Sequence, residues 1–337
     1  MTAFAELLTT GIYVPEREVS NDELRARFAK TAPDFVDKVE AASGIKTRWY
    51  APDDWSTSDL ALRAARDALN RASLTPEDLD LIVLGTDTPD YITPATSVVL
   101  QVKLGAHRAG TFDVGCACAS FPTGLMTAAG LIASQPGIQT VLVVGAYMMH
   151  RLADPSDPMV FFYGDGAGAA ILQGAEAPGL MKGAFLADGQ YARHWGIFSG
   201  GTVEPASAAS VAEGRTQVRL TEKYPSEIND EGWPKLMRSI TEQNELQMED
   251  VDLAIFTQVR RSTILKVGAE LGIPEPRLPM VMGKWGYTGS ACIGMALHDA
   301  IVQGRAKPGH LVTLVGSGVG YNQAGVALRL TEALKGG

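Results

Sequence analysis

The sequence predicts an α/β fold in which helices pack against sheets. Short apolar runs with the length of buried strands alternate, along most of the chain, with segments whose apolar residues recur at helical spacing. The chain is 337 residues long, which is more than one hydrophobic core usually supports. We therefore expect two domains or two halves.

Strands are predicted where apolar runs are bounded by glycine, proline or polar residues. In chain order they are Leu7–Tyr13, Leu81–Thr86, Gly110–Val114, Val141–Gly145, Gly168–Leu172, Leu253–Thr257 and Leu311–Gly316. The helices between them carry start signals. Residues 20–23 have the spacing of a capping box before Leu24–Phe28, residues 56–72 carry one apolar face, and residues 75–77 open a short helical turn.

The two parts of the chain show a weak internal similarity. In the first part, a cysteine-bearing turn leads into a helix of small residues over 118–133. In the second part, residues 286–292 lead into a similar helix over 293–302. An apolar strand and a glycine-rich, hairpin-like segment follow each helix. Two similar halves would explain the length, although small-residue helices recur in many α/β proteins.

This similarity divides the chain into an N-terminal half, residues 1–175, and a C-terminal half, residues 216–337. Residues 176–215 are rich in glycine, alanine, serine and proline, and no strand or helix period runs through them. We predict that they form connecting loops over one surface.

The composition is that of an ordinary globular protein, with 46% apolar and 20% charged residues. The net charge of −9 argues against a broad nucleic-acid-binding surface. Three cysteines, two of them separated by a single residue, do not make a disulfide framework, which favours a reducing cytoplasm. We find no secretory leader pattern and no apolar run of 18 residues, so we expect neither secretion nor a membrane span.

Lysine and arginine nevertheless gather in one part of the chain. The positions are Lys235, Arg238, Arg260, Arg261, Lys266 and Lys284. They form either a local basic patch or a solvated face on which basic residues cluster by chance.

Cys118 is the candidate nucleophile. It lies between the strand predicted over Gly110–Val114 and a helix predicted from Ser120 to Ser134. A cysteine at such a junction has its sulfur directed at the first unpaired N–H groups of the helix, and these groups and the helix dipole favour a thiolate. The alternative is a small buried cysteine that fills a gap in the core, and Cys116 is a good candidate for that role.

Four segments resemble the β-ketoacyl-(acyl-carrier-protein) synthase III family of the thiolase superfamily. They are Phe112–Phe121, Val141–Gly145 with the following Ala153–Asp157, Gly164–Ala170 and Gly316–Arg329. The resemblance extends from about residue 8 to residue 330. It implies a thiolase-like, duplicated βαβαβαββ fold in five layers, αβαβα, usually assembled as a homodimer.

The resemblance also implies an acyl-enzyme mechanism, in which Cys118 accepts an acyl group from a thioester. The oxyanion of the tetrahedral intermediate would be bound by the backbone N–H groups of Cys118 and Val319. Val319 lies in the turn Gly316–Gly320, which needs glycines because its backbone must approach the acyl oxygen closely. Tyr91, Ile92 and Thr93 lie where the family lines its acyl pocket, partly across the dimer interface.

Two catalytic positions differ from the family pattern. Members that condense with malonyl thioesters place a histidine and an asparagine beside the cysteine, and the resemblance puts Gln258 and Tyr287 at these positions. Both side chains can donate hydrogen bonds, but neither is a base near neutral pH. Ordinary decarboxylative condensation is therefore not expected, whereas acyl transfer to another acceptor is. His150, on the loop after Val141–Gly145, is an alternative base or an ordinary core or surface histidine.

The acyl donor is expected to be coenzyme A or an acyl carrier protein. Phe35 lies near the position of the tryptophan with which the family stacks the adenine of coenzyme A, whereas Pro158 replaces an arginine that does the same. Arg260 and Arg261 begin a predicted helix, Arg260–Leu271, whose family counterpart helps dock the carrier protein. They suit that partner or a coenzyme A phosphate, or they simply face solvent.

The sequence thus predicts a cytoplasmic acyltransferase of the 3-oxoacyl-(acyl-carrier-protein) synthase III type. No metal and no permanently bound cofactor are expected. One alternative is a catalytically degenerate subunit that partners an active homologue. Others are a hydrolase that discharges the acyl group to water and a true 3-oxoacyl synthase with an unusual active site.

Overall fold

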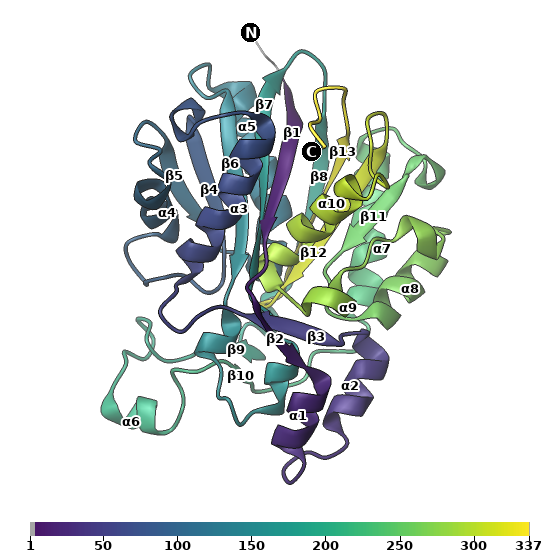
Figure 1. The fold of residues 1–337 in the computed structure, drawn as a ribbon. Helices are drawn as coiled ribbons and strands as arrows, with labels where there is room; N and C mark the ends of the chain where they lie inside the picture. Colours follow the sequence, from purple (N-terminus) through teal and green to yellow (C-terminus); the bar gives the residue numbers. More distant parts are fainter. Residues whose placement is uncertain (1–3, 337) are drawn as a thin grey trace.

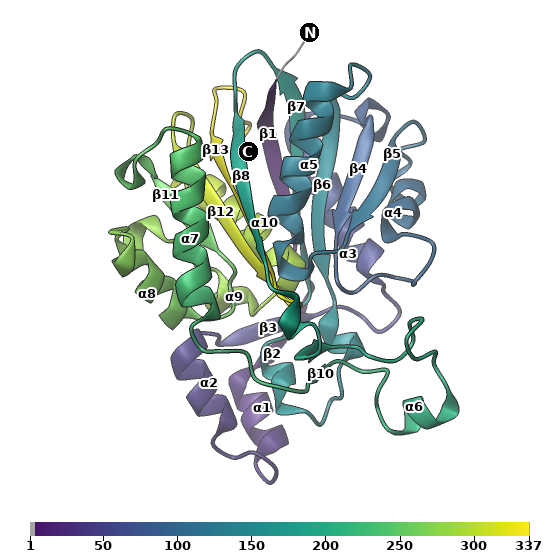
Figure 2. The same ribbon diagram turned by 180° about the vertical axis from the view of Figure 1, so that it is seen from behind.

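The computed structural model describes residues 4–336, which fold into five alternating layers of helix and sheet (Figure 1). Helices α3 (Thr57–Ala72) and α4 (Thr96–Leu104) cover the outer face of the first sheet, and α7 (Ile228–Gln243) and α8 (Arg261–Glu270) cover that of the second. Helices α5 (Ser120–Ser134) and α10 (Cys292–Val302) lie between the sheets (Figure 2). The predicted five-layer α/β architecture is confirmed.

The two sheets share one topology. The first has the order β1 (Phe4–Tyr13), β7 (Gly166–Ala175), β6 (Thr140–Tyr147), β4 (Leu81–Gly85) and β5 (Gly110–Val114). The second has the order β8 (Leu180–Ala187), β13 (Asn322–Arg329), β12 (Leu311–Gly318) and β11 (Leu253–Phe256). In each sheet the first two pairs are antiparallel and the next is parallel, so the internal similarity of the sequence is a repeat of structure.

The second half differs from the first, and from the prediction, in two places. Strand β8 lies inside residues 176–215, which were predicted to be connecting loops. Most of its residues are apolar, but they do not alternate with polar ones, and only Leu180 and Ala184 are buried in this edge strand. The second sheet also has no described strand equivalent to β5. Between α8 and α10 the chain instead forms a 3₁₀ turn, Glu275–Arg277, and the short helix α9 (Met282–Trp285).

A smaller unit lies beside the ends of both sheets. It contains the hairpin of β2 (Arg17–Ser20) and β3 (Thr47–Tyr50) and the helices α1 (Asn21–Phe28) and α2 (Phe35–Ser43). As the capping pattern predicts, the Ser20 hydroxyl accepts a hydrogen bond from the Glu23 N–H at 3.2 Å. The long connection after β8 adds β9 (Trp195–Gly196), α6 (Ala208–Ala212) and β10 (Arg219–Leu220).

Arg48 of β3 fastens this unit to the rest of the molecule. Its side chain is wholly buried and donates hydrogen bonds to the Val19 carbonyl at 3.1 Å, the Phe161 carbonyl at 3.1 Å and Asn21 Oδ1 at 2.7 Å. Burial lowers the pKa of Arg48 to about 10. The guanidinium therefore remains charged at neutral pH and joins three segments that are distant in the sequence.

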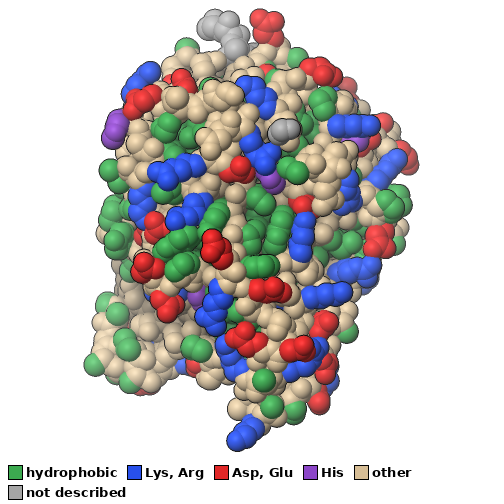
Figure 3. Space-filling model, in the orientation of Figure 1, with side chains coloured by type: hydrophobic (Ala, Val, Ile, Leu, Met, Phe, Trp, Pro, Cys, Tyr) green, Lys and Arg blue, Asp and Glu red, His purple; other side chains and the backbone are tan. Residues whose placement is uncertain are grey.

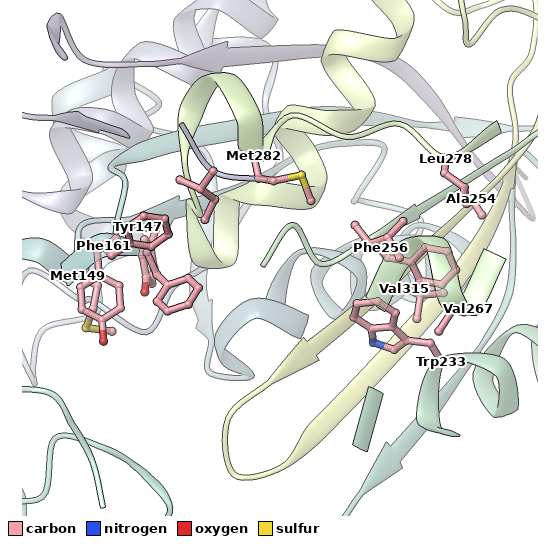
Figure 4. Packing of buried hydrophobic residues seen from close by; sticks show 14 of the residues in the cluster. Tyr147, Met149, Phe161, Trp233, Ala254, Phe256, Val267, Leu278, Met282 and Val315 are labelled. Atoms are coloured by element: carbon pink, nitrogen blue, oxygen red, sulfur yellow. The ribbon is translucent and has the colours of Figure 1, made fainter. Parts of the chain in front are cut away.

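The core contains aromatic side chains as well as aliphatic ones. Trp233 of α7 stacks on Phe256 of β11 with ring centroids 4.9 Å apart, close to Val315 of β12 (Figure 4). At the other end of the same cluster, Tyr147 and Phe161 are also buried. The cluster thus connects the outer helix of the second half with the end of strand β6 in the first.

The central helix corrects one expectation from the sequence. Residues 117–134 form a helical stretch of 18 residues with a mean hydropathy of 1.3, long and apolar enough to span a membrane, whereas no such run was expected from the sequence. In the folded chain 56% of this stretch is buried, and Phe121, Leu125 and Ile132 pack in the core between the sheets. Its apolar composition is accounted for by its place between two sheets.

Candidate active site

Cys118 lies at the junction of strand β5 and helix α5, as predicted. It is the middle residue of a short 3₁₀ helix, Ala117–Ala119, and its exposed fraction is 5%. The Ser120 hydroxyl accepts a hydrogen bond from the Cys116 N–H at 3.0 Å, which closes the turn. Ala117 has a φ of 46°, a left-handed conformation that the tight turn imposes on a residue with a Cβ.

Tyr287 is in direct contact with Cys118. The Cys118 thiol and the Tyr287 hydroxyl form a hydrogen bond. The backbone of Tyr287 is fixed on both sides, since its N–H donates to the Phe162 carbonyl at 3.0 Å and its carbonyl accepts from the Gly164 N–H at 2.9 Å. The fold therefore brings together two predicted site residues that are 169 positions apart in the sequence.

Two glycines of β12 pack against the backbone of the cysteine turn. A Cβ at Gly316 would lie 2.9 Å from Ala119 Cα and 3.0 Å from the Cys118 carbonyl oxygen. A Cβ at Gly318 would lie 2.1 Å from the Cys116 carbonyl oxygen. Only glycine allows this approach. The turn that contains Val319 follows directly, beside Cys118, and its part in an oxyanion hole stays a prediction.

Gln258 does not face Cys118, contrary to its predicted catalytic role. It is wholly buried, and its amide Nε2 donates to the Phe256 carbonyl at 2.8 Å and the Pro279 carbonyl at 3.2 Å. Its Oε1 accepts from the Val281 N–H at 2.7 Å. Both amide protons and the acceptor are thus used to hold the segment before α9, and no donor is left for a substrate.

The site disfavours a thiolate, contrary to the prediction from the helix dipole. Burial, and then the negative charge of Asp87, raise the pKa of the Cys118 thiol well above its usual value. Burial likewise raises the pKa of Tyr287. Both groups are therefore protonated near neutral pH, and the thiol must lose its proton to another group when it reacts.

Asp87 was not among the site residues predicted from the sequence. It lies just beyond the end of β4, and its Oδ1 accepts a hydrogen bond from the Ser290 hydroxyl at 2.8 Å. Burial raises its pKa to about 6. One signal in the sequence could have found it: β4 and β5 were both predicted, and the residues that follow adjacent parallel strands lie at one edge of a sheet.

Two family models match the chain. The model of 3-oxoacyl-(acyl-carrier-protein) synthase III matches residues 112–189, which include Cys118. The model of the C-terminal part of the same enzyme matches residues 241–330, which include Tyr287 and both glycines of β12. The chain belongs to the 3-oxoacyl-(acyl-carrier-protein) synthase III family.

Solved structures of this family agree along almost the whole chain. The priming β-ketosynthase of the R1128 polyketide pathway is 29% identical, with a TM-score of 0.86 over 98% of this chain and 97% of that one. The 3-oxoacyl-(acyl carrier protein) synthase III from Pseudomonas aeruginosa PAO1 is 27% identical, with a TM-score of 0.85 over 98% and 99%. The enzyme from Aquifex aeolicus VF5 is 27% identical, with a TM-score of 0.84 over 96% and 99%. These are thiolase-like condensing enzymes, a class of transferases.

His150 forms a separate pair in this synthase III fold. Its Nδ1 lies 2.6 Å from Asp165 Oδ1, and its ring stacks on Tyr50 with centroids 4.2 Å apart. Asp165 is wholly buried and also accepts a hydrogen bond from the Ala51 N–H at 2.8 Å. The His150 side chain thus links Asp165 to strand β3, and its hydrogen bond goes to Asp165 rather than to Cys118.

The residues predicted to bind the acyl donor lie around the smaller unit. Phe35 begins α2 and forms a T-shaped contact with Phe161, with ring centroids 6.4 Å apart. Arg260 and Arg261 are exposed at the start of α8. Arg261 forms an ion pair with Glu275 at 2.6 Å.

The predicted basic cluster is largely neutralised by acidic partners. Its ion pairs are Lys235–Glu231, Arg238–Glu270, Arg261–Glu275, Lys266–Asp230 and Lys284–Asp299. Figure 3 shows basic and acidic side chains interspersed over the face of the molecule that it views. Within the described residues, Arg260 is the one member of the cluster without an ion pair, so a continuous basic patch is not formed.

The predicted acyl-pocket residues are exposed in the single chain. The exposed fraction of Tyr91 is 58% and that of Ile92 is 81%, and Thr93 is exposed beside them on the loop between β4 and α4. Two surface pockets have volumes of about 400 and 460 Å³, and neither is lined by these residues or by Cys118. Cys118 itself is almost wholly buried in the single chain, with an exposed fraction of 5%.

Proposed function

We propose that this synthase III homologue is an acyltransferase in which Cys118 takes an acyl group from a thioester and passes it to an acceptor. The observation that carries the proposal is the contact of the Cys118 sulfur with Tyr287, in a turn against which Gly316 and Gly318 press. An acyl group on this sulfur would have its oxygen close to backbone N–H groups of the turn, as acyl transfer requires. Val319 and Cys118 are the proposed donors.

The acceptor step is proposed to be a transfer rather than a decarboxylative condensation. Decarboxylation leaves an enolate oxygen that must be stabilised by strong hydrogen-bond donors. Gln258 cannot supply one while its amide is bonded to three backbone groups. Tyr287 remains as a donor beside the sulfur, which supports transfer of the acyl group to an oxygen, nitrogen or carbon nucleophile.

The donor is proposed to be an acyl-CoA or an acyl carrier protein, with no resident metal or cofactor. Phe35 and the unpaired Arg260 would contact the donor, the first by stacking and the second through its charge. Both donor types present phosphate or acidic groups that suit an exposed arginine. A cytoplasmic enzyme is proposed because coenzyme A and carrier-protein thioesters are formed in that compartment.

Acyl loading is tested by intact-mass measurement after incubation with a panel of acyl-CoA and acyl carrier protein donors. We expect one acyl adduct per chain in the wild type, none in Cys118→Ala, and an unchanged adduct in Cys116→Ala. Cys116 is the matched control because it lies in the same turn and is the more exposed of the two. An adduct that persists in Cys118→Ala contradicts the proposal.

The buried and protonated thiol favours one competing function, that of a degenerate subunit without chemistry of its own. That function predicts no adduct with any donor, and binding to an active homologue. The same experiment therefore separates the two. Free acid released with no acceptor present would instead indicate a hydrolase.

We further propose that the chain forms a homodimer through strand β5. This strand is an edge of the first sheet, and apolar side chains are exposed around it: Tyr91, Ile92, Val98 and Val102. An unpaired strand edge beside exposed apolar residues is typical of an interface.

The dimer is tested by light scattering, which should give twice the chain mass for the wild type and a single chain mass for Ile92→Asp. The control is Val203→Asp, which should remain a dimer; the exposed fraction of Val203 is 95%. If Ile92→Asp is still a dimer, the interface does not lie at strand β5.

A further inference from the structure

Asp87 lies where the loop after β4 passes the cysteine turn at the start of α5. Gly85, the last residue of β4, is pressed against the start of α5: a Cβ on it would lie 2.6 Å from Ser120 Cβ. Asp87 follows two residues later, and Cys118 precedes Ser120 by two. This close approach places the carboxyl group beside the cysteine turn.

The second half of the chain holds Asp87 from the other side. Ser290, whose hydroxyl donates to Asp87 Oδ1 at 2.8 Å, is the middle residue of the 3₁₀ helix Gly289–Ala291 that leads into α10. This 3₁₀ helix is fixed by close packing, because a Cβ at Gly145 would lie 2.2 Å from the Ser290 carbonyl oxygen. Asp87 is thus positioned by a donor that is itself rigidly placed.

The titratable groups around this carboxyl group are thiols and phenols. Burial, and to a smaller extent the charge of Asp87, raises the pKa of Cys118, Cys292, Tyr147 and Tyr163, and Tyr287 is in contact with Cys118. Each of these groups is protonated at neutral pH. Burial raises the pKa of Asp87 to about 6, whereas the hydrogen bonds from Ser290 and from its own backbone N–H lower it. At neutral pH the carboxylate is therefore the charged group that can accept a proton here.

We propose that Asp87 is the proton acceptor for Cys118 in acyl transfer. This rests on the proposed function, in which Cys118 receives the acyl group. The Cys118 S–H bond breaks and its proton passes to Asp87 while the sulfur bonds to the thioester carbon. When the carbon–sulfur bond to the donor breaks, the leaving thiolate takes the proton from Asp87. The carboxylate is restored, and no electrons are gained or lost.

The test compares the pH dependence of two reactions of Cys118 between pH 5 and 9: alkylation by iodoacetamide, followed peptide by peptide, and acylation by the donor that loads the wild type. In the wild type the rates of both reactions should fall as the pH drops through about 6, because protonated Asp87 accepts no proton, and should stay level above that pH. We call this fall in rate the acid limb of the profile. In Asp87→Asn acylation at pH 7 should be about 10²–10⁴ times slower. Its rate should rise steadily with pH, because hydroxide must then remove the proton.

Further variants separate proton transfer from a structural role. Ser290→Ala removes a hydrogen bond that lowers the pKa of Asp87. The pKa of Asp87 should therefore rise in this variant, and the fall in the rate of Cys118 acylation should occur at a higher pH. Asp87→Glu keeps a carboxylate and should retain an acid limb. Asp90→Asn, three residues along the same loop, is the matched control and should keep the wild-type profile.

The two proposals can be overturned separately. If Asp87→Asn keeps the wild-type rate and acid limb, or if Ser290→Ala leaves the limb where it is, Asp87 is not the proton acceptor. If iodoacetamide gives the expected profiles but no thioester acylates the wild type, the acyltransferase proposal is contradicted while the proton acceptor is supported. If one of Asp87→Asn, Asp87→Glu and Ser290→Ala fails to fold, the pH profiles of the other two still test the proposal.

Discussion

Replacement of Gly318 by alanine is expected to slow the acylation of Cys118 by about 10²-fold, the usual consequence of moving a reacting group by about 1 Å. The new Cβ would lie 2.1 Å from the Cys116 carbonyl oxygen, so either strand β12 or the cysteine turn must shift. The nearest neighbours are the Cys116 carbonyl group and the Ala117 Cβ, so no flexible side chain can rotate away. Overpacking of this kind should also lower the free energy of unfolding by about 1–3 kcal/mol.

Gly115→Ala is the matched control for this prediction. Gly115 lies in the same turn, but a Cβ on it would have no neighbour within 4 Å, so acylation and stability should remain close to those of the wild type. The rate of acylation is measured by intact mass against time, and the free energy of unfolding by urea unfolding. An unchanged acylation rate in Gly318→Ala would mean that the approach of β12 to the cysteine turn is not needed for the reaction.

Replacement of Gln258 by alanine is expected to have its main effect on folding rather than on chemistry. The amide satisfies three buried backbone groups, of Phe256, Pro279 and Val281. Each buried group left without a partner costs about 1–3 kcal/mol, so the free energy of unfolding should fall by about 3 kcal/mol or more. The midpoint of urea unfolding measures this loss.

Gln101→Ala serves for comparison, because its side chain donates a single hydrogen bond, to the Ala109 carbonyl at 2.8 Å, and is only partly buried. Its loss should cost about 0.5–1.5 kcal/mol. A Gln258→Ala protein with wild-type stability but no acylation would show instead that the amide acts on the substrate, as the sequence alone had suggested.

The strands of the first sheet could be predicted because most of them are buried on both faces and form unbroken apolar runs. Strand β6, for example, is buried along almost its whole length. Strand β8 was not predicted, because Lys182 and Gly183 interrupt its apolar residues and no alternation of apolar and polar residues marks a half-buried strand. The layer order came from the family resemblance rather than from periodicity.

Part of the site could be predicted because it follows from local sequence. The position of Cys118 before α5 is such a feature, and the family motif added its neighbour Tyr287. The orientation of Gln258 is not local, since it depends on where the segment before α9 passes. Asp87 was missed for a similar reason: nothing in its own sequence context shows that Ser290 lies opposite it.

The two 3₁₀ helices that precede α5 and α10 have the same backbone conformation but carry different side chains. Both open with a residue of left-handed φ, 46° at Ala117 and 45° at Gly289. The middle residue is Cys118 in one copy, which is hydrogen-bonded to Tyr287, and Ser290 in the other, which is hydrogen-bonded to Asp87. One copy thus presents the nucleophile, whereas its twin presents a hydroxyl that steadies a carboxylate. In the proposed mechanism the two copies of this turn therefore have different roles, and the reaction needs residues from both halves of the chain.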